Sequence, residues 1–215
     1  MALEATHIRF ALDLKKRYKV QDEHKYILGS VYPDSRYLTG INREKTHQVN
    51  FNTQNIDGIS DFQKGWLTHL ICDRSQKYII RDLFPELFNP EIKIKQGDEA
   101  WISITVLKIL QDRIDVEKIN VKKFLSNIHS LESPNDEELK VLEKYYEILY
   151  EMYDDINFEN HIEKSLKMWL GFGVDNVLVD KIRKRAIVFA DDESVINRVK
   201  LIYEKQILEI NNYNL

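Results

Sequence analysis

The sequence predicts a mainly α-helical protein, and three observations lead to that prediction. The chain has 215 residues with only seven glycines and four prolines, so few positions interrupt a helix. Apolar residues recur at three- and four-residue spacing over long stretches, which is typical of amphipathic helices. Strict alternation of apolar and polar residues, as in half-buried strands, is scarce. We expect a single multi-helix domain, with residues 1–115 as its core and 116–215 as a C-terminal helical extension packed on it.

The longest amphipathic pattern begins at residue 60. Ser60 and Gln63 have the spacing of a capping box, which predicts a helix that begins there and runs to about Leu83. Residues 98–113 are apolar on almost every side and should form the most buried helix. We expect the remaining helices over residues 6–19, 23–28, 116–130, 135–155, 159–170, 175–190 and 192–210.

Residues 29–47 interrupt the helical pattern. Gly29, Pro33 and Gly40 predict a loop with little regular structure, and Gly29 is expected to end the preceding helix. The segment also carries several charged and aromatic side chains. Long polar loops held in place by aromatic residues often carry function, so this segment is a candidate part of a binding site.

Two later helices carry polar side chains whose placement is informative. Lys108 lies on the most apolar helix, where it can extend to solvent, pair with Asp112 or reach into a site. His161 is two residues from Glu163, and side chains at that spacing diverge on a helix. We therefore expect both His161 and Glu163 to face solvent.

Composition and charge limit the classes of function. The net charge is −4, basic and acidic residues are interspersed, and no basic stripe indicates nucleic-acid binding. No apolar run reaches the ~18 residues of a transmembrane segment, and the first ten residues lack a signal-peptide pattern, so we expect a cytoplasmic protein. Cys72 is the only cysteine, which excludes an intrachain disulfide and a thiolate-based zinc site. The sequence leaves the oligomeric state open.

Five histidine and aspartate residues occupy positions that need a physical explanation. His69 and Asp73 are one turn apart on the apolar face of the long central helix, where an aspartate is costly unless it is paired, hydrogen-bonded or metal-bound. His7 shares the apolar face of the first helix. Asp34 and His47 lie in the polar segment between these helices. Each residue alone could belong to a buried hydrogen-bonded network, but the set offers imidazole and carboxylate ligands.

These ligand types suit a divalent metal ion. Imidazole and carboxylate without thiolate favour Zn²⁺ first, with Mn²⁺ and Fe²⁺ as alternatives. Five ligands are more than one closed tetrahedral zinc site needs. A bridging carboxylate would let two ions share them, so we expect one or two ions.

The order of these residues resembles the zinc-dependent phospholipase C and nuclease superfamily of all-helical metal phosphohydrolases. The stretches THIRFAL, GSVYPDSRY, REKTH and THLICD carry the resemblance, which covers residues 7–73, about a third of the chain. It implies an all-helical fold, with Asp34 or Asp73 bridging ions or orienting water. The implied metal ligands are His7, Asp34, His47, His69 and Asp73. The chain departs from the family downstream, because no histidine occurs between His69 and His129, which leaves ligands for a reduced one- or two-metal site.

The resemblance favours a metal-dependent hydrolase that acts on a small-molecule or lipid phosphoester. Asp34 or Asp73 would orient the attacking water or take its proton, and Arg36 and Arg43 are the candidates for binding phosphoryl oxygens. Another class stays open: a non-enzymatic helical scaffold or interaction protein with a degenerate metal site. A nucleotide phosphohydrolase of the His-Asp type ranks below both, because the sequence has no adjacent His-Asp pair.

Overall fold

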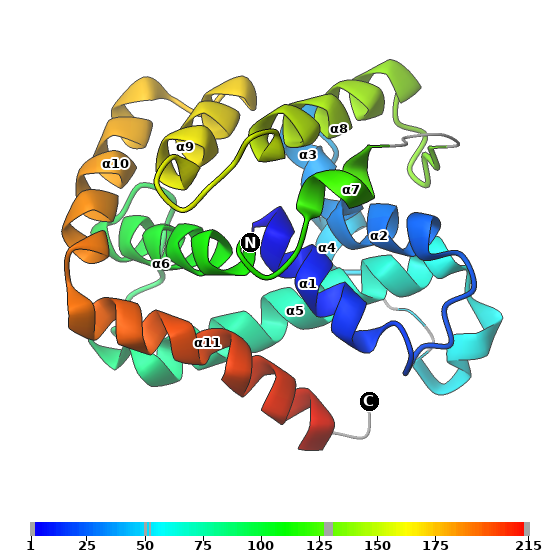
Figure 1. Ribbon diagram of the computed structural model, residues 1–215, viewed down its shortest axis with the longest axis horizontal. Helices are drawn as coiled ribbons and strands as arrows, with labels where there is room; N and C mark the ends of the chain where they lie inside the picture. Colours follow the sequence, from blue (N-terminus) through cyan, green and yellow to red (C-terminus); the bar gives the residue numbers. More distant parts are fainter. Residues whose placement is uncertain (1–2, 50, 52, 127–130, 213–215) are drawn as a thin grey trace.

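The computed structural model describes residues 3–49, 51, 53–126 and 131–212, and all regular elements in these residues are helical (Figure 1). The mainly α-helical prediction is confirmed, with 72% helix and no strand in the described part of the chain. None of its helices is both long and apolar enough to span a membrane. The elements are α1 (Glu4–Leu14), α2 (Glu23–Val31), η1 (Tyr32–Ser35), α3 (Arg36–Thr39), α4 (Arg43–His47), η2 (Thr53–Gly58), α5 (Asp61–Leu83), η3 (Pro85–Leu87), α6 (Glu99–Asp115), α7 (Val121–Leu125), α8 (Leu139–Tyr153), α9 (His161–Gly171), α10 (Asn176–Ala190) and α11 (Glu193–Asn212).

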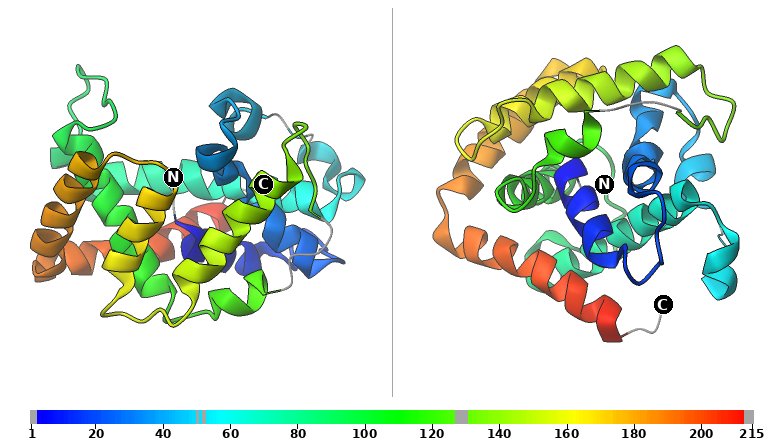
Figure 2. Two further views of the ribbon diagram at one scale, coloured as in Figure 1. Left: turned by 90° about the horizontal axis from the view of Figure 1, so that it is seen from above. Right: turned by 45° about the vertical axis from the view of Figure 1, so that its right-hand side comes forward.

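The long helix α5 begins where the sequence predicts. The Ser60 hydroxyl accepts a hydrogen bond from the backbone N–H of Gln63 at 3.2 Å, and the Gln63 side chain accepts one from the N–H of Ser60 at 3.0 Å. This capping box satisfies two N–H groups that a helix start leaves unpaired. Helices α1, α2 and α11 all contact α5, which runs across the molecule between them (Figures 1 and 2).

Two glycines let the backbones of α2 and α5 touch. A Cβ atom at Gly65 would lie 1.9 Å from the carbonyl oxygen of Tyr26, and one at Gly29 would lie 2.0 Å from the carbonyl oxygen of Phe62. No side chain fits at these distances, so each glycine is required by the contact. The prediction that Gly29 ends α2 is therefore wrong, since the helix continues to Val31.

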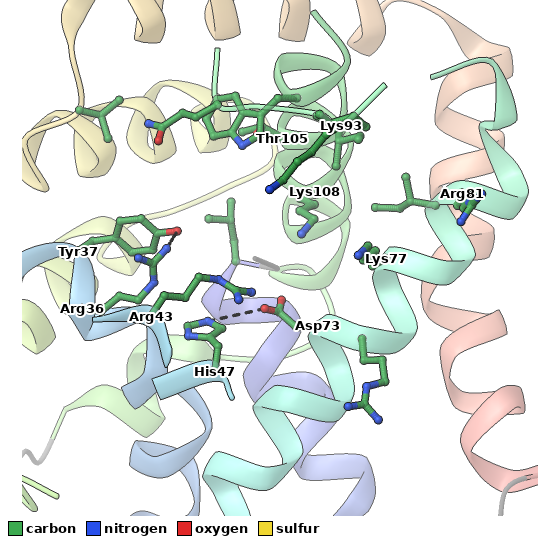
Figure 3. Close-up of a pocket in the computed structure, with 18 of the residues that line it drawn as sticks. Arg36, Tyr37, Arg43, His47, Asp73, Lys77, Arg81, Lys93, Thr105 and Lys108 are labelled. Carbon is green, nitrogen blue, oxygen red and sulfur yellow. Dashed lines mark hydrogen bonds and ion pairs between the residues drawn. The ribbon is translucent and has the colours of Figure 1, made fainter. Parts of the chain in front are cut away.

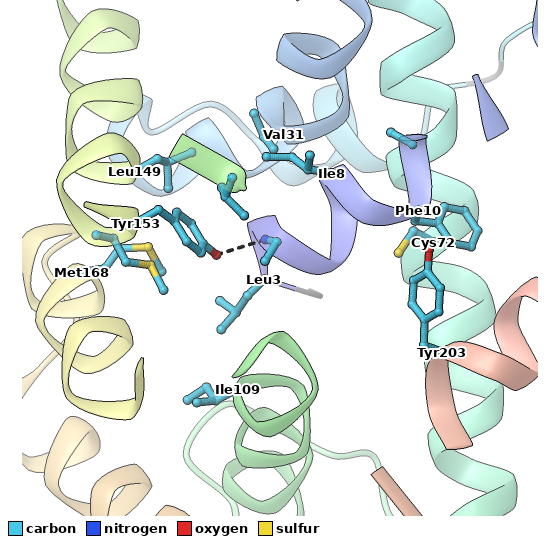
Figure 4. Packing of buried hydrophobic residues seen from close by; sticks show 14 of the residues in the cluster. Leu3, Ile8, Phe10, Val31, Cys72, Ile109, Leu149, Tyr153, Met168 and Tyr203 are labelled. Carbon is cyan, nitrogen blue, oxygen red and sulfur yellow. Dashed lines mark hydrogen bonds between the residues drawn. The ribbon is translucent and has the colours of Figure 1, made fainter. Parts of the chain in front are cut away.

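Helix α1 receives its N-terminal hydrogen bonds from other helices, because its own N-cap residue is apolar. The Asp112 carboxylate accepts from the N–H of Thr6 at 3.0 Å, and the Tyr153 hydroxyl oxygen accepts from the N–H of Ala5 at 3.0 Å (Figure 4). Asp115 accepts from the Thr6 hydroxyl at 2.7 Å. Carboxylates at a helix N-terminus also interact favourably with the helix dipole. Helices α6 and α8 therefore fix where α1 begins.

The same network corrects two expectations about polar residues. His161 is fully buried rather than solvent-facing, and its Nε2 lies 2.8 Å from an Asp112 carboxylate oxygen. Asp112 also accepts from the Tyr153 hydroxyl at 2.9 Å, so its oxygens face α1, α8 and α9. The pairing of Lys108 with Asp112 is therefore wrong, and Lys108, one turn earlier on α6, instead lines a cleft. Glu163 faces solvent as expected.

The segment 29–47 is mostly helical, which corrects the prediction of an irregular loop. It folds into the end of α2 followed by η1, α3 and α4. Pro33 lies in the first turn of η1, where its missing N–H costs nothing. Gly40 ends α3 with a φ of 72°, and the Asn42 side chain caps α4 by accepting from the N–H of Glu44. Residues that often form turns therefore mark the beginnings and ends of short helices in this segment.

The second half of the chain closes the hydrophobic core around α1 and α6 (Figure 4). Helices α8, α9, α10 and α11 lie near their predicted positions, and Asp175 caps α10 as its sequence suggests. The predicted helix over residues 116–130 is too long. Only Val121–Leu125 is helical, because Asn120 caps a new helix there, and residues 127–130 lie outside the described part of the chain.

Replacing Gly65 with alanine should push α2 away from α5 and lower the free energy of unfolding. A methyl group inserted into a packed contact typically costs about 1–3 kcal/mol, and here it meets rigid backbone rather than a mobile side chain. Thermal unfolding measures the effect. Gly171→Ala is the matched control, because that helical glycine has no neighbour closer than 3.8 Å to an added Cβ. Equal melting temperatures for the two variants would contradict the close contact.

Candidate metal centre

The structure brings together all five residues of the expected ligand set. His7 comes from α1, Asp34 from η1, His47 from the end of α4, and His69 and Asp73 from successive turns of α5. The imidazole rings of His7 and His69 stack with centroids 3.8 Å apart and planes 13° apart. Residues separated by up to 66 positions in the sequence thus meet at one point.

The distances between these side chains suit an ion between them better than direct hydrogen bonds. The Nε2 atoms of His7 and His69 each lie 3.9 Å from a carboxylate oxygen of Asp34 and 3.9 Å from one of Asp73. Hydrogen bonds between such atoms are normally about 2.7–3.2 Å long. Two ligands that are each ~2.1 Å from one ion can be at most about 4.2 Å apart. The observed separations fall in that range.

His47 completes the set from the cleft side. Its Nε2 lies 3.4 Å from Nε2 of His69, 3.3 Å from a carboxylate oxygen of Asp34 and 3.8 Å from one of Asp73. Its ring packs edge-on against that of His69, with centroids 5.1 Å apart. The five side chains therefore form two overlapping groups that share His69, one with His7 and Asp34 and the other with His47 and Asp73, and each group is compact enough to hold an ion.

The second nitrogen of two histidines is held by a neighbouring group. His69 Nδ1 lies 2.9 Å from the backbone carbonyl oxygen of Ser30, so it carries the proton and donates. His47 Nδ1 lies 2.8 Å from the Thr46 hydroxyl. Such contacts fix the ring orientation and direct Nε2 into the site, which is the usual arrangement around metal-ligating histidines. Trp66 supports this side of the site, because its indole N–H donates to the Thr46 carbonyl at 2.7 Å.

Several buried polar atoms at the centre have no hydrogen bond. Both ring nitrogens of His7 and both carboxylate oxygens of Asp34 are inaccessible and lack a hydrogen-bond partner of acceptable geometry in the described residues. Leaving such groups unpaired costs roughly 1–3 kcal/mol each, and more for a charged group. A cation bound in the set would satisfy Nε2 of His7, which faces both carboxylates, together with the oxygens of Asp34. This is the main observation in favour of a metal ion.

Burial and charge set the protonation state that metal binding requires. Burial lowers the pKa of both His7 and His69, so their rings are neutral at pH 7. Burial alone would raise the pKa of Asp34, but the nearby imidazoles of His69 and His47 outweigh it and lower that pKa to about 2. Neutral imidazole and ionised carboxylate are the forms that ligate divalent metals.

The set is closed on one side and open on the other. The side chains of His7, Asp34 and His69 are at most 1% exposed, whereas that of Asp73 is 13% exposed. Asp73 and His47 line a cleft of about 1390 Å³ between α3–α4 and α5–α6 (Figure 3). Within the described residues, the cleft therefore gives access to the set from the side of these two residues.

The cleft is strongly basic, although the whole chain is acidic. Arg36 and Arg43 approach Asp73 from one wall, and Lys77, Arg81 and Lys108 extend from the opposite wall (Figure 3). The Arg36 guanidinium lies over the Tyr37 ring at 4.1 Å and donates to the Tyr37 hydroxyl at 2.6 Å. Arg43 takes part in none of the ion pairs found in the described residues, and its side chain reaches toward Asp73 in Figure 3.

Sequence reasoning found the five side chains that cluster here but missed part of their surroundings. The carbonyl of Ser30 belongs to the backbone and leaves no trace in the sequence. Lys77 and Arg81 could have been found, because they continue the four-residue spacing of His69 and Asp73 along α5.

Comparison of the chain with protein-family models, curated proteins and solved structures finds no match. The possible function of this site is therefore inferred from its geometry.

Metal binding should depend on His69, which belongs to both possible ligand groups. Protein purified without chelator should contain metal, and His69→Ala should weaken its affinity by more than about 100-fold, since even supporting residues are worth 10- to 100-fold. Elemental analysis and titration with Zn²⁺ measure this. His24→Ala is the control, because it removes an imidazole of α2 outside the set. Equal metal content in the two variants would show that His69 is a packing residue.

The two buried histidines should titrate below pH 6.5 in metal-free protein, because burial disfavours their charged form. Folding lowers their pKa, so metal-free protein should lose stability as the pH falls below the ordinary histidine pKa of about 6.5. NMR of the imidazole carbon-bound protons gives the midpoints. Midpoints at or above 6.5 for His7 and His69 would contradict the buried, neutral state.

Proposed function

We propose that this protein is a metal-dependent hydrolase that cleaves a phosphoester. The observation that carries the proposal is a buried His/Asp set which opens only into a cleft lined by cations. The set supplies ligands for one or two divalent ions, with Zn²⁺ favoured by three imidazoles and Mn²⁺ or Fe²⁺ as alternatives. The cations favour a negatively charged substrate.

The five side chains divide into two roles. His7, Asp34 and His69 are sealed from the cleft and hold the ion. Asp34 stays ionised because its pKa is about 2, which suits a permanent ligand rather than a proton acceptor. Asp73 is the most exposed member and faces the cleft, so its carboxylate is placed to orient an attacking water. A divalent ion bound here would lower the pKa of that water toward neutrality.

Arg36 and Arg43 are the candidates for phosphate binding. Guanidinium groups match the geometry of phosphoryl oxygens and can donate two parallel hydrogen bonds. Tyr37 fixes the Arg36 side chain by stacking and hydrogen bonding, and the Nε atom of Arg36 is buried without a partner in the described residues. Arg43 lies at the start of α4, one turn before His47, so its charge is beside the open face of the set.

Arg43→Gln should lower kcat/KM for a phosphoester by about 10- to 100-fold while metal content stays the same, since a hydrogen bond to a charged group is worth ~1.5–3 kcal/mol. The assay uses metal-loaded protein with 4-nitrophenyl phosphate and bis(4-nitrophenyl) phosphate. Arg183→Gln is the matched control, because Arg183 is a surface residue of α10 paired with Glu163 and Asp180.

Two results would separate hydrolysis from a scaffold with a degenerate metal site. Hydrolysis that requires the metal and is abolished by Asp34→Asn supports the enzyme. Metal-loaded protein that cleaves neither ester at any pH between 5 and 9, despite full occupancy, favours the non-enzymatic alternative.

A further inference from the structure

The cations that line the cleft include two groups on opposite walls. Arg36 and Arg43 belong to α3 and α4, whereas Lys77, Arg81 and Lys108 belong to α5 and α6 on the opposite wall (Figure 3). A phosphate held at the metal ligands and bound by the first group does not need the second. The second group therefore requires its own explanation.

The second group extends away from the ligand set along α5. Asp73, Lys77 and Arg81 are four residues apart, and each step of four residues advances about 6 Å along a helix. Arg81 thus lies about 12 Å beyond Asp73 along the helix axis. Lys108 projects into the cleft from α6, and it is close enough to Asp73 to help lower the pKa of that buried carboxyl. A single phosphate cannot contact both ends of this row.

Within the described residues, these cations differ from several other basic side chains, which form ion pairs with carboxylates. Within the described residues, Lys77, Arg81 and Lys108 take part in no ion pair. Elsewhere basic side chains lie close to carboxylates: Arg185 is 2.6 Å from Glu99, and Arg198 is 2.8 Å from Glu86. Like charges that gather in a cleft repel one another unless an anion binds between them.

Ordinary surface charge explains only part of this row. Arg81 lies in the last turn of α5, where a cation interacts favourably with the helix dipole. Lys77 lies one turn earlier, and Lys108 is a half-buried residue in the middle of α6. The cleft wall beyond Lys108 also contains Trp169, whose Nε1 is buried without a hydrogen-bond partner in the described residues. A ligand that fills the cleft would supply acceptors for these donors.

We propose that Lys77, Arg81 and Lys108 form a second anion site, and that the substrate carries two phosphate groups. One phosphate ester is cleaved at the metal ligands, and the other phosphate binds about one to two helical turns farther along α5. The inference rests on the proposed hydrolase function and specifies its substrate class. A bisphosphorylated nucleoside and a bisphosphorylated cyclic polyol share this chemistry.

The test compares two esters with the same scissile bond. These are the 4-nitrophenyl ester of thymidine 5′-phosphate and the same ester with an added 3′-phosphate. The second should have a KM lower by about tenfold or more, since one charge-assisted contact is worth that factor. The double variant K77Q/R81Q should bring the ratio of the two KM values close to one. Lys140→Gln, an exposed lysine on α8, should leave the ratio unchanged.

A binding measurement separates this inference from hydrolysis itself. Calorimetry with thymidine 3′,5′-bisphosphate and with inositol 1,4-bisphosphate should show binding that K77Q/R81Q weakens by about tenfold or more, even if neither ester is cleaved. Tighter binding of the thymidine compound would identify a nucleotide as the source of the two phosphates, and tighter binding of the inositol compound would identify a cyclic polyol. Equal KM values for the two esters in the unaltered protein, or bisphosphate binding unaffected by K77Q/R81Q, would overturn the second anion site.

Discussion

The backbone contact between α2 and α5 at Gly29 and Gly65 is the constraint on which the rest of the site depends. It places the Ser30 carbonyl against Nδ1 of His69, so the end of α2 orients a side chain of α5. The chain then passes directly from α2 into η1, which carries Asp34. A wider spacing of the two helices would separate these groups. The geometry of the site therefore depends on Gly29 and Gly65, whose lack of a side chain lets the two helices approach this closely.

Electrostatics explains why the site favours a cation. Two ionised carboxylates beside the neutral imidazoles of His7 and His69 leave a net negative charge in a largely buried site, and burying charge without a partner is costly. Imidazole–carboxylate distances of 3.3–3.9 Å do not close this deficit through hydrogen bonds. A divalent ion would offset the charge and satisfy Nε2 of His7 and the oxygens of Asp34. The basic cleft outside attracts the opposite sign of charge, so the two regions differ in the charge that they favour.

Sequence patterns predicted the helical class, the capping box at Ser60 and the inward faces of His7, His69 and Asp73, whereas Asp34 and His47 were chosen from their polar segment and from the family resemblance. The inward placements succeeded because the 3.6-residue repeat sets the face of a helix whatever the tertiary fold. It could not show that Gly29 is a contact residue, since glycine also ends helices. It also misplaced His161, because its burial depends on Asp112, which is 49 positions away. Long-range partners of this kind are set by packing and are invisible to local patterns.

The central claim is that the five side chains surround a metal ion. Anomalous X-ray diffraction above and below the zinc absorption edge, on crystals of protein purified without chelator and supplied with Zn²⁺, tests it most directly. The account predicts an anomalous peak within the set, about 2.0–2.2 Å from Nε2 of His69 and from the other members of one of its two ligand groups, His7 with Asp34 or His47 with Asp73. A map with no peak at this position, in which the side chains have closed into hydrogen bonds of about 2.7–3.2 Å, would contradict it.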